Sequence, residues 1–218
     1  MTWLRNPTNM PLRSVHIEGE LRKLSREQLQ TALAGTVRGG FFTVNVEAVR
    51  RAAESLPWVE SATVRRVWPD RLQLQVVEQR AAARWGEDGV LNMRGQLFKP
   101  DAATIPAKLP QLDGPKELRR RVMENYIAMT ATLAPIGRRV QALRLDQRRA
   151  WVLTLDSGVE LKLGRDDALE RVGRFVRVYA TLFAARETEL KTVDLRYSNG
   201  FAVRWDRSPE TAGQQQEG

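Results

Sequence analysis

The residues of this 218-residue chain that could carry out chemistry are few. Its one histidine, His16, stands in an alternating run typical of a strand, where a structural role is more frequent than catalysis. Asp166 and Asp167 precede a helical pattern, and carboxylates at that place complement the helix dipole. Gly39 and Gly40 are not followed by the Lys-Ser or Lys-Thr pair of a phosphate-binding loop. The pattern therefore predicts no enzyme, no catalytic residue, no cofactor site and no metal site.

Composition narrows the remaining classes of protein. Cysteine is absent, which excludes disulfides, thiolate catalysis and thiolate metal ligands. No apolar run approaches the roughly 20 residues that a transmembrane helix needs, and no signal peptide is visible. Lys and Arg number 35 against 26 Asp and Glu, a net charge of +9, and the arginines are spread among acidic residues. Without a recognisable nucleic-acid-binding motif this distribution favours a solvated basic surface, and a basic nucleic-acid binder stays an alternative.

Binding is the chemistry that remains, and the segment 192–205 is the strongest candidate for it. Asn199 and Gly200 favour a tight β-hairpin turn between two alternating runs. One face of the hairpin is expected to be apolar and the other polar: Val193, Leu195, Tyr197, Phe201, Val203 and Trp205 against Asp194, Arg196, Ser198, Ala202 and Arg204. Only a polar tail, 207–218, follows, and it is expected to be disordered. The hairpin is therefore predicted to be a sheet edge that can accept a partner's strand, with an ordinary closing hairpin as the alternative.

Two domains are expected to position this hairpin, after a connector at 1–12. The range 13–80 predicts the order β-α-α-β-β. Its elements are a strand at 14–18, a helix capped by Ser25, a helix from Val46 to Leu56, and strands at 59–68 and 72–78. Ala62, Val64 and Trp68 are expected on one face of the first strand of the final pair.

The range 81–206 predicts a second, α+β domain. Short strands are expected at 90–91 and 96–98, a loop at 101–115, and longer strands at 140–145, 151–155 and 159–163. A first helix carries the apolar stripe Leu118, Val122, Tyr126, Met129 and Leu133. A second helix, capped by Asp166 or Asp167, is expected to bury Leu169, Val172, Val176, Tyr179 and Phe183.

Several motifs in these elements resemble a known family. G-G-F-F-T-V at 39–44, L-P-W-V at 56–59 and V-R-R-V-W-P-D-R-L-Q-L-Q-V-V-E at 64–78 resemble a POTRA domain, the polypeptide-transport-associated module. With W-V-L-T-L at 151–155, L-K-L-G-R at 161–165 and V-D-L-R-Y-S-N-G at 193–200, the chain from Pro11 to Trp205 is similar to the FtsQ family of bacterial cell-division proteins.

The resemblance implies a fold, a location and partners. The fold is α+β, an N-terminal POTRA domain followed by a mixed β-sheet domain with two packing helices and a C-terminal edge hairpin. Family members are single-pass inner-membrane proteins, so this chain is expected to be a periplasmic portion that works at the division septum. The β domain of the family binds FtsB, itself paired with FtsL, and the POTRA domain is implicated in recruitment by FtsK.

The resemblance also assigns individual residues. The FtsB-binding positions of the family fall on Arg148, Arg196, Tyr197, Asn199 and Trp205. The recruitment positions of the POTRA domain fall on Val46, Ser61, Val64 and Arg66. A second alternative remains beside the nucleic-acid binder, namely a POTRA-containing component of outer-membrane assembly or secretion that binds unfolded polypeptides.

Overall fold

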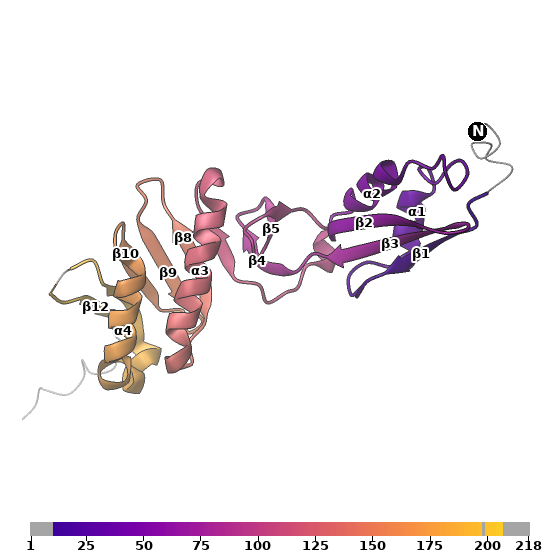
Figure 1. The fold of residues 1–218 in the computed structure, drawn as a ribbon. Coiled ribbons are helices and arrows are strands. Elements are labelled where there is room, and N and C mark those ends of the chain that lie inside the picture. The colour runs from indigo at the N-terminus through magenta and orange to yellow at the C-terminus, as the bar shows by residue number, and fades with distance from the viewer. Residues whose placement is uncertain (1–10, 198, 207–218) are drawn as a thin grey trace, which may run out of the picture. The chain divides into compact units, whose positions relative to one another are not determined.

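The computed structural model describes residues 11–197 and 199–206, which form two compact units (Figure 1). The first unit runs to Ala81 and includes Phe98–Ile105, and the second comprises Ala82–Leu97 and the described chain from Pro106 onward. The expected tail, 207–218, and residues 1–10 of the expected connector lie outside the described residues. The domain limits expected at 80/81 and 206 stay predictions.

The first unit has the order β-α-α-β-β, as expected. Its elements are β1 (Ser14–Glu18), α1 (Arg26–Leu33), α2 (Val46–Glu54), β2 (Val59–Val67) and β3 (Arg71–Glu78). The three strands form one sheet in the order β1-β3-β2, with β1 parallel and β2 antiparallel to the central strand β3. Because β3 is central, β1 and β2 are the two edges of this sheet. The helices cover the sheet and bury its apolar side chains (Figure 1).

Local signals explain where the two helices begin. The Ser25 hydroxyl accepts the main-chain N–H of Gln28, and the Gln28 side chain accepts that of Ser25, which forms a capping box for α1. The Asn45 side chain caps α2 by accepting the N–H of Ala48. The expected helices therefore form where short-range sequence patterns place them.

Trp68 corrects the expectation for β2. Ala62 is buried and Val64 half-buried, but the Trp68 side chain is 76% exposed. The strand ends at Val67, so Trp68 belongs to the turn before β3 and no longer follows the alternation of the strand. Trp68, expected on the same strand face as Ala62 and Val64, therefore lies outside the strand with its side chain exposed.

The second sheet has nine strands in the order β12-β11-β10-β9-β8-β7-β4-β5-β6. Their bounds are β4 (Ala81–Trp85), β5 (Gly89–Asn92), β6 (Leu97–Phe98), β7 (Gln111–Asp113), β8 (Val140–Leu145), β9 (Trp151–Leu155), β10 (Glu160–Gly164), β11 (Leu190–Asp194) and β12 (Ala202–Trp205). The helices α3 (Arg119–Leu133) and α4 (Ala168–Leu182) pack together on one face of this sheet. Short 3₁₀ turns occupy η2 (Ala102–Thr104), η3 (Lys116–Leu118), η4 (Ala134–Ile136) and η5 (Ala184–Glu189).

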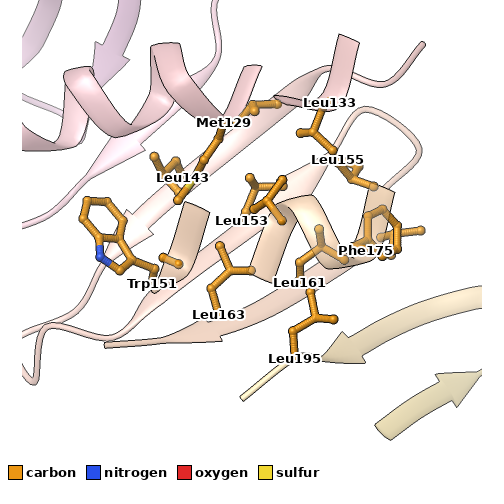
Figure 2. Packing of buried hydrophobic residues seen from close by; sticks show 14 of the residues in the cluster. Met129, Leu133, Leu143, Trp151, Leu153, Leu155, Leu161, Leu163, Phe175 and Leu195 are labelled. Atoms are coloured by element: carbon orange, nitrogen blue, oxygen red, sulfur yellow. The ribbon is translucent and has the colours of Figure 1, made fainter. Parts of the chain in front are cut away.

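The core of the second unit lies between the helices and the middle strands. Figure 2 shows leucines of neighbouring strands packed against the helices, and their side chains are at most 1% exposed: Leu143, Leu153, Leu155, Leu161, Leu163 and Leu195. Phe175 of α4 and Met129 of α3 are fully buried against them. This core ends close to the terminal hairpin, because Leu195 directly follows β11.

Two expectations for this unit are wrong. The range 101–115 was expected to be a loop, yet it contains β7, which pairs in parallel with both β4 and β8. Three residues are too few to show an alternating pattern, and only the pairing of Leu112 with Trp85 and Leu143 makes this segment a strand. Part of the segment expected to be a loop therefore contributes a strand to the sheet.

The start of α4 also differs from the expectation. Asp167 occupies the N-cap with a positive φ of 53°, and its side chain makes no capping hydrogen bond. The buried face runs through Ala168, Val172 and Phe175, whereas Leu169 is 41% exposed. The buried face of the helix is thus rotated relative to the expected stripe. Phe175 is buried in the core, and Leu169 turns toward solvent.

The terminal hairpin is wider than expected. β11 ends at Asp194 and β12 starts at Ala202, so the pair Asn199-Gly200 lies within a longer loop and does not connect the strands directly. The N–H of Leu195 donates to the carbonyl of Lys162 in β10, which draws the chain away from the β11–β12 pair. Leu195 stays buried while Tyr197 is 57% exposed, and Ser198 lies outside the described residues. β12 nevertheless forms the edge of the sheet, as expected.

Candidate functional site: the edge strand of the second unit

The edge strand β12 pairs with β11 on one side only. Thr192, Val193 and Asp194 face Arg204, Val203 and Ala202 in an antiparallel register. The N–H of Asp206 donates to the carbonyl of Glu189 and so points toward β11. Main-chain N–H and C=O groups of successive strand residues point to alternate sides, so those of Val203 and Trp205 point away from β11. Within the described part of the chain, no hydrogen bond from another element reaches this outer side.

Aromatic packing fixes β12 to the core. Trp205 is half-buried, with its ring centroid 6.3 Å from that of Phe183 and the Arg186 guanidinium 4.8 Å from its centroid. Phe201, just before the strand, packs at 5.5 Å against the same Phe183. Both aromatic side chains therefore hold the strand in place, and Trp205 also keeps part of its surface accessible to a partner.

Arg196, two residues after the end of β11, lies on a carboxylate support. Its Nε donates to Oδ1 of Asp194 at 2.8 Å and its Nη2 donates to Oδ2 at 2.6 Å. The Arg196 side chain is 57% exposed and that of Asp194 only 14%. The Arg196 guanidinium lowers the pKa of Asp194, so the carboxylate stays charged over the neutral range. This pair orients the guanidinium at the surface, and its Nη1 has no hydrogen bond among the described residues.

Arg174 of α4 holds the loop that carries Arg196. Its Nη2 donates to the carbonyl of Leu195 at 2.8 Å and to that of Tyr197 at 3.0 Å. Arg171, one turn earlier on the same helix, donates to the carbonyl of Leu163 in β10. Sequence reasoning missed both residues, because their pattern on the helix looks like an ordinary charged face. Arg174 sets the position of the loop at 195–197, and Arg171 ties α4 to β10.

The remaining expected contact residues lie near this loop to different degrees. The carbonyl of Arg148, in the β8–β9 turn, accepts a hydrogen bond of 2.6 Å from Nε of Arg165. Arg165 follows Gly164, where an added Cβ would lie 3.2 Å from Cγ of Arg196. Arg148 and Arg196 thus lie at one end of the sheet. Arg148 contacts Arg165, and Arg196 lies next to the preceding residue, Gly164. Asn199 is exposed on the loop after Tyr197.

The expected recruitment residues of the first unit have a different character. Val46 begins α2 and is half-buried, and on β2 Ser61 is exposed and Val64 half-buried. Arg66 is turned toward its own unit, since its Nε donates to the carbonyl of Phe41 at 2.9 Å and its Nη2 to that of Val44 at 2.7 Å. Arg66 therefore connects β2 to the loop before α2.

The open side of β2 is also partly occupied. The N–H of Ala62 donates to Oε1 of Glu54 on α2 at 3.1 Å, which places this N–H on the side away from β3. Arg50 holds the same carboxylate through its Nη1, at 2.5 Å, and also contacts Glu47. A carboxylate on an edge N–H is one way in which proteins protect an edge strand from pairing.

Two features are absent from the described residues. No group of three or more His, Cys, Asp or Glu side chains in 11–197 and 199–206 is arranged to hold a metal ion. Over the same ranges, no helix combines the length and the apolar character that crossing a bilayer requires.

The fold and the site together define a class of protein: a POTRA-type unit followed by a mixed β-sheet unit with an open terminal edge. The model for the POTRA domain of FtsQ type matches residues 10–79, and that for the C-terminal part of cell division protein FtsQ/DivIB matches 83–196. The chain belongs to the FtsQ family of cell-division proteins.

Whole-chain relatives agree with the family models. Cell division protein FtsQ of Allochromatium vinosum is 42% identical over 205 residues, which cover 94% of this chain and 82% of that protein. The same-named proteins of Coxiella burnetii and Xanthomonas campestris pv. campestris are 37% and 40% identical over 202 and 193 residues. These alignments cover 93% and 88% of this chain, and 83% and 69% of the two relatives. Of the three classes that the sequence leaves open, these matches support the cell-division family.

Proposed function

We propose that this chain is a non-enzymatic scaffold of the division machinery that captures FtsB, paired with FtsL, on the edge strand β12. It links early and late division proteins and so regulates septal cell-wall synthesis, as a periplasmic portion held at the inner membrane of the septum. The observations that carry this proposal are the free outer side of β12 and the exposed Arg196, which follows the neighbouring strand β11. An edge strand with free main-chain groups can pair with an extended peptide in the same way as it pairs with its neighbour.

Main-chain pairing alone is too weak for a specific complex. The edge strand has four residues, so an added strand forms about four hydrogen bonds at ~1 kcal/mol net each. Micromolar affinity requires about 8 kcal/mol. Side chains must therefore supply about half of the binding free energy.

Arg196 is the best-placed side chain for that contribution. A guanidinium that reaches a partner carboxylate forms charge-assisted hydrogen bonds worth about 1.5–3 kcal/mol each. Arg148 and Arg165 add positive charge at the same end of the sheet. Tyr197, 57% exposed on the same loop, offers an aromatic surface with a hydroxyl. This combination fits an FtsB segment that carries acidic residues next to its pairing strand.

Charge reversal of Arg196 tests the proposal. Arg196→Glu should abolish binding of a soluble FtsB fragment, measured by calorimetry, because it places a carboxylate where the partner is expected to be acidic. Arg139→Glu is the matched control, since Arg139 pairs with Asp156 in the same unit in a similar way, with an Nε–Oδ2 distance of 3.2 Å. We expect the control to keep the affinity of the unchanged chain. Equal binding by Arg196→Glu and the unchanged chain, with both folded, would refute the site.

A second surface is proposed for recruitment through FtsK. It consists of Val46, Ser61, Val64 and Arg66 in the first unit. Support comes from the accessible side chains of Ser61 and, in part, Val46 and Val64. Since Arg66 also holds the loop at 41–44, an effect of its replacement on recruitment needs a stability measurement beside it.

A further inference from the structure

One end of the first unit exposes large apolar side chains that its core does not use. Trp68, in the turn between β2 and β3, is 76% exposed, and Val67 beside it is 38% exposed. Phe42, in the loop before α2, is 45% exposed. Trp68 is the most exposed large apolar residue of the described chain, and apolar surface that is not buried in the fold often marks an interaction site.

Hydrogen bonds bring the two segments to the same end. Arg66, next to Val67, donates to the carbonyls of Phe41 and Val44, which flank Phe42 along the loop. Phe41 and Phe42 pack edge to face with their ring centroids 5.1 Å apart. Figure 1 shows the β2–β3 turn at the end of the sheet, on the side where the described chain begins. The exposed apolar residues therefore lie at one end of the first unit.

Arginines surround these apolar residues. Arg65 and Arg71 stand on either side of the turn, and the N–H of Arg13 donates to the carbonyl of Asp70 within it. The side chains of Arg13 and Arg71 are 76% and 65% exposed, and both contact the carboxylate of Asp70. Nε of Arg65 donates to the side chain of Gln73 at 2.5 Å, so its charge is not paired with a carboxylate there.

We propose that this end, the arginine–tryptophan tip formed by Arg13, Phe42, Arg65, Val67, Trp68 and Arg71, binds the surface of an anionic phospholipid bilayer. A tryptophan ring is favoured at the boundary between headgroups and acyl chains, since one part of it is apolar and its N–H is polar. Arginines around it are attracted to anionic lipid headgroups. The inference goes beyond the proposed function, which gives this unit a role only in recruitment.

The geometry favours a bilayer over an acidic protein segment. An acidic segment that binds as an added strand needs free main-chain groups at an edge, but the edge N–H of Ala62 on β2 is already bonded to Glu54. The tip instead presents its residues from a turn and a neighbouring loop at the end of a sheet. Such a surface can insert one ring and place charges on a flat, anionic layer, which needs no preformed complementary shape.

Vesicle flotation of the full 218-residue chain tests this proposal. The chain should float with vesicles of phosphatidylglycerol mixed with phosphatidylcholine, float much less with pure phosphatidylcholine, and lose binding as salt is raised. Replacing Arg65 and Arg71 together by Ala should weaken binding about 25-fold, at about five-fold for each arginine. Trp68→Ser should weaken it several-fold and remove the part of the tryptophan fluorescence that brominated acyl chains quench.

Two variants serve as matched controls. Tyr197→Ser removes another exposed aromatic side chain, and Arg22→Ala removes a 79%-exposed arginine of the same unit that lies near Glu78, at the opposite end of β3. Both should bind vesicles like the unchanged chain, and thermal unfolding should show that every variant is folded. Equal binding to the two kinds of vesicle, or normal binding by Trp68→Ser, would overturn the proposal. Trp68-dependent binding to an acidic polypeptide but not to vesicles would also overturn it, in favour of a protein partner.

Discussion

Each unit has a sheet with an edge strand, β2 in the first and β12 in the second, and the outward main-chain groups of these two strands differ in whether they are already hydrogen-bonded. On β2 the outward N–H of Ala62 is bonded to Glu54, and Arg66 reaches back to its own unit. On β12 the outward main-chain groups have no partner among the described residues, and Arg196 lies at the surface on its Asp194 support. Position at the edge of a sheet is therefore not sufficient for strand capture. The side chains beside the edge decide whether it is available.

The same contrast separates the two arginines that the family resemblance assigns to binding surfaces. Arg66 donates to two main-chain carbonyls, and loss of the guanidinium would leave both without this hydrogen-bond donor in the folded unit. Arg196 contacts a side chain at a largely exposed place, where an ion pair contributes little to stability. Arg66 is thus expected to matter mainly for folding and Arg196 mainly for binding.

The largest expected effect tests that assignment in the first unit. Arg66→Ala should lower the free energy of unfolding by about 2–3 kcal/mol, because two carbonyls lose their charged donor. Thermal unfolding of the variant measures this loss. Arg65→Ala is the control. Among the described residues, the side-chain hydrogen bond of Arg65 goes to the Gln73 side chain, so this variant should lose little free energy of unfolding. If both variants unfold like the unchanged chain, the distinction between the two arginines fails.

An intermediate effect is expected where the second unit depends on the half-buried Arg174. Arg174→Met removes the donor to the carbonyls of Leu195 and Tyr197, so the loop that presents Arg196 loses its fixed position. Affinity for the FtsB fragment should fall about 10- to 30-fold, equivalent to about 1.5–2 kcal/mol. Arg177→Met, at an exposed position one turn later on α4, should leave the affinity unchanged. Unchanged affinity in Arg174→Met would show that the loop needs no support.

The smallest effect concerns the occupied edge of β2. Glu54→Ala should cost about 1 kcal/mol of stability, because one partly exposed hydrogen bond is lost. It should also speed amide hydrogen exchange at Ala62 and leave FtsB binding unaffected. Glu47→Ala, which removes the other carboxylate on Arg50, should not change exchange at Ala62. Slow exchange at Ala62 in both variants would mean that Glu54 does not protect this edge.

Much of the fold could be predicted because its signals are local. The Ser25 capping box and the alternation of Trp151, Leu153 and Leu155 lie within a few residues, and each led to an element that the structure contains. The edge position of β12 could be predicted as well. β7 could not, because its three residues become a strand only through pairing with β4 and β8. Likewise, the exposure of Trp68 follows from β2 ending at Val67, one residue earlier than the expected strand.

The candidate site was predictable in its position but not in its construction. The sequence by itself determined the order of elements, the two apolar cores and the terminal strand, since these depend on side-chain periodicity and capping. Tertiary structure alone decided that Arg66 faces its own loop, that Arg174 fixes Tyr197, and that Glu54 closes one edge while the other stays open. Each of these contacts joins residues on different elements, and the direction of a long charged side chain follows from the acceptor that folding places within its reach.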